Sequence, residues 1–430
     1  MKDPIVLRRD DTLTFSQANY WKDLLYRVIK IGTEVEVAPP KRLERKEFED
    51  LVIASLVPSG TYDVLGPFGV VDVKPEHCGI EIRVNGRQPY FRSIQEQYQG
   101  IMSRLLELGA RARPTCGLHF HLLTPNLAEP VPEIILANLW NLVRRYAPEL
   151  RFITSGGASR SSLCRRRNYT SHIEMVRHSP IHMTMAQIQE ELHRSSIVPD
   201  HQNFLNLQHL RFTEDGGIQP FHLEFRFADT DLSATSITAK TFLFLALALK
   251  SIDLSQYGVI HVGKVNTWRR KVELLGMLNN NDGELATSDT RGVTDDVIAE
   301  LRQGSHEMLD FLAPTFERID ANAALEVLEL LAETPASLLR CAGYDWPDIE
   351  HLTASRAAPD DFGVDEIDRR LMQRIELGEW NRLASVEEWK WRAASELFLT
   401  PQELDRRIEK VKTLRGLHWS ESQGTYVFDR

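Results

Sequence analysis

Two histidines alternate with apolar residues in residues 116–122, which read CGLHFHL. In a β-strand, side chains two positions apart point to the same face, so His119 and His121 would lie side by side opposite an apolar face. A single histidine on a strand is usually an ordinary polar residue with a satisfied hydrogen bond. Two on one face of an apolar strand indicate a charged partner, such as a metal ion or a phosphate group.

Three further segments alternate in the same way, at residues 31–37, 78–84 and 221–231. The charged side chains that share a face in each predicted strand are Glu34 with Glu36, Glu81 with Arg83, and Glu224 with His222 and Arg226. Taken alone, each pattern is also typical of an edge strand with a solvated face. Together, the strands would gather at least four carboxylates, two imidazoles and an arginine on one surface.

Gathered carboxylates repel one another, and their burial is costly unless cations lie between them. Mg²⁺ and Mn²⁺ prefer oxygen ligands, and Mn²⁺ accepts an imidazole more readily. These ions usually complete their coordination with water and substrate phosphates, and arginines bind phosphate oxygens well. The charged strands therefore predict a site for divalent cations and phosphate.

An arginine-rich segment follows at residues 155–169, which read SGGASRSSLCRRRNY. It is rich in glycine and serine and then carries Arg165, Arg166 and Arg167. In an acidic chain, such a segment is either a solvated loop or a loop that faces a phosphate, and the pattern leaves both open.

The bulk properties exclude several classes of protein. The net charge of −10 is opposite to the basic footprint of a general nucleic-acid binder. The four cysteines contain no CxxC pair, which is typical of a reducing cytoplasm and not of a zinc site. Residues 1–10 lack the apolar run of a signal peptide, and the longest apolar stretch, residues 241–249, is too short to span a bilayer. We expect a cytoplasmic protein with neither a nucleic-acid nor a membrane partner.

The remaining pattern predicts how the chain is organised. Expected helices cover residues 91–108, 131–150, 184–193 and 238–254, with a short strand at 203–207 and a strand or short helix at 20–29. Beyond about residue 265 helical patterns dominate, with capping boxes at residues 385–388 and 400–403, a stop at Gly416, and polar breaks at 279–292 and 354–363. We expect a first domain at residues 1–265, which carries every charged strand, and a helical accessory domain at residues 266–430.

Three motifs in chain order resemble the signature of a known family. EVE at 34–36, GLHFH at 117–121 and LEFRFAD at 223–229 resemble the amidoligase branch of the glutamine synthetase-like and glutamate–cysteine ligase-like carboxylate–amine ligases. The resemblance covers about residues 31–255, and the helical C-terminal region lies outside it. It implies an α+β fold in which a glutamine synthetase-like curved antiparallel sheet, flanked by helices, surrounds ATP and two or three divalent ions. Residues 1–265 would then be the catalytic domain.

The resemblance also implies roles for individual residues. The metal ligands would be Glu34, Glu36, Glu81, His119 and Glu224. The contacts to nucleotide phosphates or substrate would come from His119, His121, Arg165, Arg166, Arg167 and Asn206. Arg226 would stabilise the transferred phosphoryl group, with Glu224 as the second catalytic residue. Asp72 is a further candidate ligand, although residues 71–76 match the family's acidic segment poorly.

The implied reaction is an ATP-dependent ligation. A substrate carboxylate would attack the γ-phosphate of ATP to form an acyl phosphate, and an amine would then displace phosphate to form an amide, with release of ADP and phosphate. The cofactors would be ATP and Mg²⁺ or Mn²⁺, and the substrates would be small molecules or peptides. Some relatives build their sites between subunits, so a homo-oligomer is also compatible with the resemblance.

Two other interpretations fit parts of the pattern. One is an ATP-independent hydrolase in which the His-x-His pair binds a metal and recruits further histidines from His172, His178 and His182. The other is a non-catalytic scaffold that binds a nucleotide.

Overall fold

The computed structural model describes most of the chain. The described residues are 12–57, 68–87, 89–113, 116–124, 127, 129–156, 182, 184–194, 205–206, 217–218, 222–259, 265–279, 293–357, 364, 366–378, 380–383 and 385–428. The arginine-rich segment with Arg165, Arg166 and Arg167, two of the three further histidines (His172 and His178), and residues 280–292 of the predicted polar break lie outside them.

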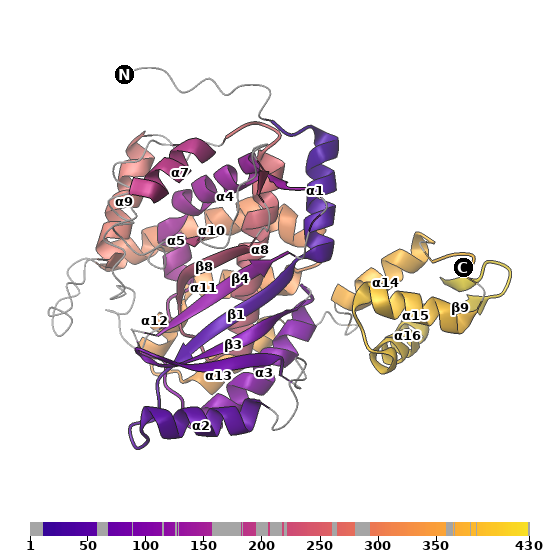
Figure 1. Cartoon of the computed structure of the whole chain (residues 1–430), viewed down its shortest axis with the longest axis horizontal. Coiled ribbons are helices and arrows are strands. Elements are labelled where there is room, and N and C mark those ends of the chain that lie inside the picture. Colours follow the sequence, from indigo (N-terminus) through magenta and orange to yellow (C-terminus); the bar gives the residue numbers. More distant parts are fainter. Residues whose placement is uncertain are drawn as a thin grey trace.

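Among the described residues, six strands form one antiparallel sheet in the order β2-β3-β1-β4-β8-β6 (Figure 1). Their bounds are β1 Lys30–Val37, β2 Val70–Glu76, β3 Gly79–Arg87, β4 Gly117–Leu123, β6 Leu205–Asn206 and β8 His222–Asp229. The four alternating strands and the short strand are thus confirmed within a few residues. Strand β2 was not predicted as a strand, because Pro75 interrupts its pattern; proline is tolerated there because β2 is an edge strand.

The apolar face of the sheet packs on a helical layer whose centre is α8, Ala234–Leu254. Phe244 of α8 stacks on Phe225 and packs at a tilt against Phe120, with ring centroids 4.5 and 5.0 Å apart. Helix α8 begins at Ala234, four residues before the predicted start, because Ser233 caps it and accepts a hydrogen bond from the Ser236 amide. It also packs against α3 (Phe91–Glu107), α4 (Glu133–Arg145) and α1 (Phe15–Val28).

Other predictions for this part of the chain need correction. The segment at 20–29 belongs to the longer helix α1, which begins at a capping box formed by Thr14 and Gln17. The single helix expected at 131–150 is two helices, α4 and α5 (Ala147–Ile153), separated at Tyr146 just before Pro148. The other described elements before residue 265 are α2 (Arg45–Leu56), α7 (Met185–Arg194) and the paired short strands β5 (Val131–Pro132) and β7 (Gly217–Ile218).

The described helices after residue 265 contribute to three separate hydrophobic clusters, of which the smallest includes Leu274, Val297 and Leu301. Helices α10 (Asp295–Arg318), α11 (Asn322–Glu333), α12 (Ala336–Cys341) and α13 (Trp346–Arg356) contribute to the same core as the sheet, and α9 (Val265–Asn279) lies beside α5. A second cluster, which we call the C-terminal unit, joins α14 (Glu366–Glu376), α15 (Val386–Leu397), α16 (Pro401–Arg415) and a hairpin of β9 (Leu417–Ser420) and β10 (Thr425–Phe428). The protein is therefore an α+β structure with a mainly helical C-terminal region.

The two predicted helix starts in the C-terminal unit are confirmed. Ser385 and Thr400 each accept a hydrogen bond from the amide three residues later, and Gly416 ends α16 in the left-handed region. The C-terminal hairpin was not predicted. The core cluster that contains the sheet also includes residues as far as Ala357. The division into domains at residue 265 stays a prediction.

A carboxylate from the second half of the chain caps the central helix. Glu350 of α13 accepts hydrogen bonds from the Ser233 hydroxyl at 2.8 Å, the Thr235 amide at 2.9 Å and the Thr235 hydroxyl at 2.7 Å. A negative charge at a helix N-terminus is stabilising. The donors of Ser233 and Thr235 are buried away from water, so Glu350 is their hydrogen-bond acceptor.

We expect Glu350→Ala to lower the free energy of unfolding by about 1–3 kcal/mol, because buried donors at the start of α8 lose their acceptor. Urea unfolding measures this change. Glu326→Ala removes an exposed glutamate of the neighbouring helix α11 and is expected to stay within about 0.5 kcal/mol of wild type. Equal effects of the two substitutions would contradict the capping role.

Candidate functional site

The strand registers bring the predicted polar residues to one face of the sheet. Glu34 of β1 lies opposite Arg83 of β3 on one side and opposite His119 of β4 on the other. Glu36 lies opposite Glu81. The remaining pairings place Glu224 of β8 between His121 and Asn206.

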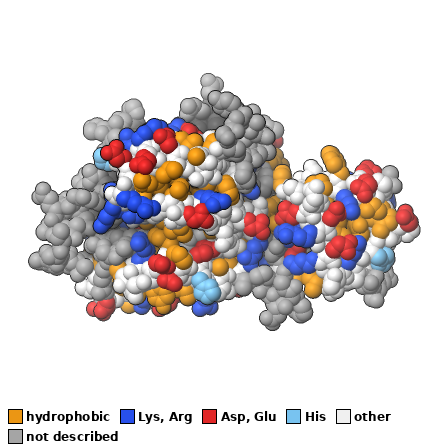
Figure 2. Space-filling model, turned by 90° about the horizontal axis from the view of Figure 1, so that it is seen from below, with side chains coloured by type: hydrophobic (Ala, Val, Ile, Leu, Met, Phe, Trp, Pro, Cys, Tyr) orange, Lys and Arg blue, Asp and Glu red, His pale blue; other side chains and the backbone are white. Residues whose placement is uncertain are grey.

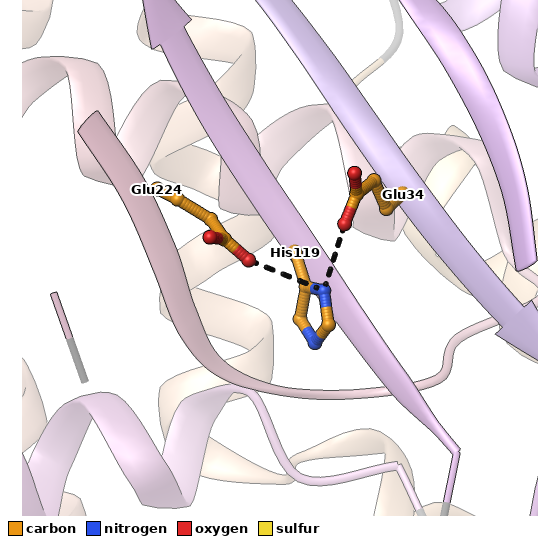
Figure 3. A group of neighbouring side chains, drawn as sticks. All are labelled: Glu34, His119 and Glu224. Carbon is orange, nitrogen blue, oxygen red and sulfur yellow. Dashed lines mark hydrogen bonds and ion pairs between the residues drawn. The ribbon is translucent and has the colours of Figure 1, made fainter. Parts of the chain in front are cut away.

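His119 lies at the centre of this face and is only 1% exposed. Its Nδ1 atom lies 3.2 Å from Glu34 Oε2 and 3.4 Å from Glu224 Oε1, as Figure 3 shows. Its Nε2 atom lies 3.6 Å from Glu36 Oε1. The imidazole therefore contacts carboxylates from two strands through its two nitrogens.

These contacts define two groups of potential metal ligands among the described residues. Glu34, His119 and Glu224 form one, and Glu36, Glu81 and His119 form the other; within each group the ligand atoms lie within 4.8 Å of one another. Two carboxylates and one imidazole form a donor set that suits Mn²⁺ and is compatible with Mg²⁺. The residues present thus fit the divalent cations that the sequence predicts.

The charges on this face lower the pKa values of two of its carboxyl groups, Glu34 and Glu224. Burial opposes ionisation of Glu34, but hydrogen bonds with His119 and His121 outweigh it and hold the pKa of that carboxyl well below its ordinary value. Burial also opposes ionisation of Glu224, and the charges of His119 and Arg226 lower its pKa overall. Both side chains are therefore carboxylates at neutral pH, which is the form that binds a cation.

The pKa of Glu81 is shifted in the opposite direction. Burial and the nearby charge of Glu34 raise the pKa of Glu81, although Arg83 opposes the shift. Arg83 Nε lies 2.8 Å from Glu81 Oε1 and 3.2 Å from Glu34 Oε1, so it links the two ligand groups. A cation near Glu81 would remove the repulsion that raises its pKa.

Backbone groups at the start of β4 hold Glu36 in place. The Gly117 amide donates a hydrogen bond to Glu36 Oε2 at 2.5 Å, and the Cys78 thiol lies 3.6 Å from the same oxygen. The Thr230 hydroxyl donates to the backbone carbonyls of both Glu36 and Gly117. Sequence reasoning assigned no role to these supporting residues, although Gly117 is the first residue of the GLHFH motif and Thr230 directly follows the LEFRFAD motif.

Glu224 is held by two neighbours that the sequence did predict as site residues. The Asn206 amide donates to Glu224 Oε2 at 2.6 Å, and the Arg226 guanidinium donates to Glu224 Oε1. His121 lies beside them, with its Nδ1 atom 3.1 Å from Nε2 of His222 and its Nε2 atom 3.7 Å from Glu34 Oε2. His222 was not predicted as a site residue, although the alternation placed it on this face.

The structure thus brings together most of the predicted site residues, namely Glu34, Glu36, Glu81, His119, His121, Asn206, Glu224 and Arg226. Arg165, Arg166 and Arg167 lie outside the described residues. Asp72 lies opposite Arg83 on the edge strand, pairs with Lys74 at 3.3 Å, and belongs to neither ligand group. Each group found in the described residues holds a single histidine, so the histidine-rich hydrolase site is not favoured.

The lowered pKa of Glu34 predicts a pH dependence of stability in protein treated with a chelator. As the pH falls below the ordinary value of 4.5, the unfolded chain takes up the Glu34 proton first, so this contribution to stability is lost with falling pH. We expect Glu34→Gln to make the fall in unfolding free energy below about pH 4.5 shallower than in wild type. Urea unfolding at a series of pH values measures the slope.

Glu81→Gln provides the comparison of opposite sign. Because the folded-state pKa of Glu81 is raised, its protonation favours the folded state as the pH falls toward 4.5. Glu81→Gln is therefore expected to make the free energy of unfolding fall more steeply as the pH is lowered toward 4.5. Parallel pH profiles for wild type and both variants would contradict the described electrostatics.

Two solved structures show a distant likeness to this chain. No family model and no curated protein matches the chain. Among solved structures, it is similar to a bifunctional glutathione synthetase from Pasteurella multocida, with 11% identity, a TM-score of 0.41, and coverage of 84% of this chain and 57% of the other. It is also similar to the complex between the prokaryotic ubiquitin-like protein Pup and its ligase PafA, with 12% identity, a TM-score of 0.34, and coverage of 92% and 85%.

The chain spans less than two thirds of the length of the glutathione synthetase. Among the described helices, none combines the length and the hydropathy that crossing a membrane requires.

Proposed function

We propose that the protein is an ATP-dependent carboxylate–amine ligase whose catalytic site is the polar face of the six-stranded sheet. The observation that carries the proposal is the cluster around His119, where carboxylates from three strands converge on one buried imidazole. Apart from Glu81, these residues belong to the three motifs that resemble the amidoligase family, and their meeting in one place supports a shared role.

In this proposal the two ligand groups hold divalent cations. Glu34, His119 and Glu224 would hold one, and Glu36, Glu81 and His119 the other. Mg²⁺ or Mn²⁺ bound there would neutralise the charge on ATP phosphate oxygens, which phosphoryl transfer requires. The hydrogen bonds from Gly117 and Asn206 keep Glu36 and Glu224 oriented before any ligand arrives.

Arg226 is the group proposed to act on the transferred phosphoryl. Its guanidinium is tied to Glu224 and mostly buried, so its position on the polar face is restricted. When a substrate carboxylate oxygen bonds to the γ-phosphorus and the bond to the ADP oxygen breaks, Arg226 would offset the negative charge spread over the phosphoryl oxygens. An amine would then attack the acyl carbon and phosphate would leave, which yields the amide.

The proposed substrates are a small-molecule or peptide carboxylate and an amine. The test is Mg²⁺-dependent ADP release by the purified protein with pooled amino acids and short peptides. We expect release that rises with particular pairs of acid and amine and stops when Mg²⁺ is chelated. Binding of Mg²⁺-ATP without turnover in any pool would favour the non-catalytic scaffold, and absence of ATP binding would overturn the proposal.

A further inference from the structure

A cleft of about 760 Å³ lies where the C-terminal unit meets the rest of the molecule. Its walls come from α1 and α10 on one side and from α14 and α15 on the other. Figure 2 shows basic and acidic side chains close together where the C-terminal unit joins the larger part. The cleft is on different elements from the polar face of the sheet, and its volume is in the range of ligand pockets, which often lie at such junctions.

The described lining is rich in arginine. Its charged residues are four arginines (Arg318, Arg370, Arg374 and Arg392) and three carboxylates (Asp23, Asp320 and Glu396). Arg318 pairs with Asp23 at 3.4 Å, near the rim. The other three arginines share two carboxylates, so this part of the cleft has an excess of positive charge.

Arg370 is fixed at the base of the cleft. Its guanidinium carbon lies 4.7 Å from the ring centre of Tyr26 and 4.9 Å from that of Tyr90, and its Nη2 donates to the Ile319 carbonyl at 2.6 Å. Its distance to Asp320 Oδ2 is 3.7 Å, longer than a hydrogen bond. Burial raises the pKa of Asp320.

Arg374 and Arg392 donate hydrogen bonds to the same carboxylate, that of Glu396. Glu396 accepts hydrogen bonds from Arg374 and Arg392 at 3.0 Å each, and from the Trp380 indole at 3.0 Å. Burial and the neighbouring charge of Arg374 lower the pKa of Arg370, so the two guanidinium groups repel each other. An added anion between them would relieve this repulsion.

The cleft also presents apolar side chains to solvent. Phe398 is 57% exposed and Leu377 is 66% exposed. Phe398 ends α15 in the left-handed region, with φ of 56°, where a bulky side chain is unfavourable. Helix α16 of the same unit ends in the same region with Gly416, which carries no such cost. Phe398 is therefore exposed at the cleft in an unfavourable backbone conformation, which indicates that its side chain contacts a ligand there.

We propose that this cleft binds an acidic peptide segment, with a peptide carboxylate on Arg370 and Arg374 and an apolar side chain against Phe398 and Leu377. Guanidinium groups bind carboxylates through paired hydrogen bonds, and the lining carboxylates accept hydrogen bonds from peptide amides. A peptide also offers apolar side chains for Phe398 and Leu377, which a polyphosphate does not, so a peptide matches the lining better. The proposal goes beyond the ligase function and does not depend on it.

Fluorescence anisotropy tests this with the full chain and a short fluorescein-labelled peptide of alternating glutamate and leucine. We expect saturable binding that Arg374→Gln and Phe398→Gly each weaken about tenfold or more. Phe398→Gly is informative because glycine is favoured at a positive φ, so this variant should keep or raise the thermal stability while it loses binding.

Arg415→Gln is the matched control, because it makes the same substitution in the C-terminal unit at an exposed arginine that does not line the cleft. It should bind the probe as wild type does. Absence of saturable binding, equal affinity in all variants, or displacement of the probe by tripolyphosphate but not by unlabelled peptide would overturn the proposal.

Discussion

Glu224→Gln is expected to lower ATP-dependent ADP release by about 10²–10³-fold, the range found when one preorganised polar group of a catalytic site is removed. Glutamine keeps the size of the side chain but removes its negative charge. The variant therefore loses one carboxylate of the group formed with Glu34 and His119, and the carboxylate that holds the Arg226 guanidinium. Steady-state ADP release in the proposed Mg²⁺-dependent assay measures the change.

Two variants show whether such a loss is specific. Arg226→Ala is expected to cause a decrease of the same order in turnover, since it removes the group proposed to stabilise the phosphoryl in flight. Glu107→Gln, at an exposed position near the end of α3, should retain wild-type activity. The assignment would be wrong if both Glu224→Gln and Arg226→Ala kept wild-type turnover.

The alternation of residues in the strands was sufficient to predict the polar face. Because side chains two residues apart share a face, the pattern alone placed Glu34 with Glu36 and Glu224 with Arg226, and the structure confirms both pairs on one surface. Their meeting at His119 depends on the strand order, which periodicity does not determine. The resemblance to a family provided the expectation that these residues meet at one site, but not the order of the strands.

Other parts of the site depend on contacts that no local pattern contains. Asn206 lies in a two-residue strand, and only its pairing with β8 brings it to Glu224. The hydrogen bond from the Gly117 amide to Glu36 comes from backbone geometry and not from a side chain. Glu350 accepts a hydrogen bond from the Thr235 amide, which lies more than a hundred positions earlier in the chain. The motifs end near residue 255, so they gave no sign of this contact.

His119→Asn is expected to remove most of the divalent-cation binding, because His119 is the one residue that both ligand groups share among the described residues. In wild type at a Mn²⁺ concentration one hundred times the dissociation constant, a single site would raise the free energy of unfolding by about 2.7 kcal/mol. In the variant, each group keeps only its two carboxylates. We expect Mn²⁺ affinity to fall by more than the about 10–100-fold seen when a residue that merely orients a metal ligand is removed.

His121→Asn is the matched comparison, since His121 lies on the same strand but in neither ligand group. Electron paramagnetic resonance of free Mn²⁺ counts bound ions without any catalytic readout, and urea unfolding with and without Mn²⁺ reports the linked stability. If His121 faces the nucleotide as proposed, its variant should keep Mn²⁺ binding and instead raise the KM for ATP. Equal loss of Mn²⁺ in the two variants, or none in His119→Asn, would show that the cations do not bind at the two groups centred on His119.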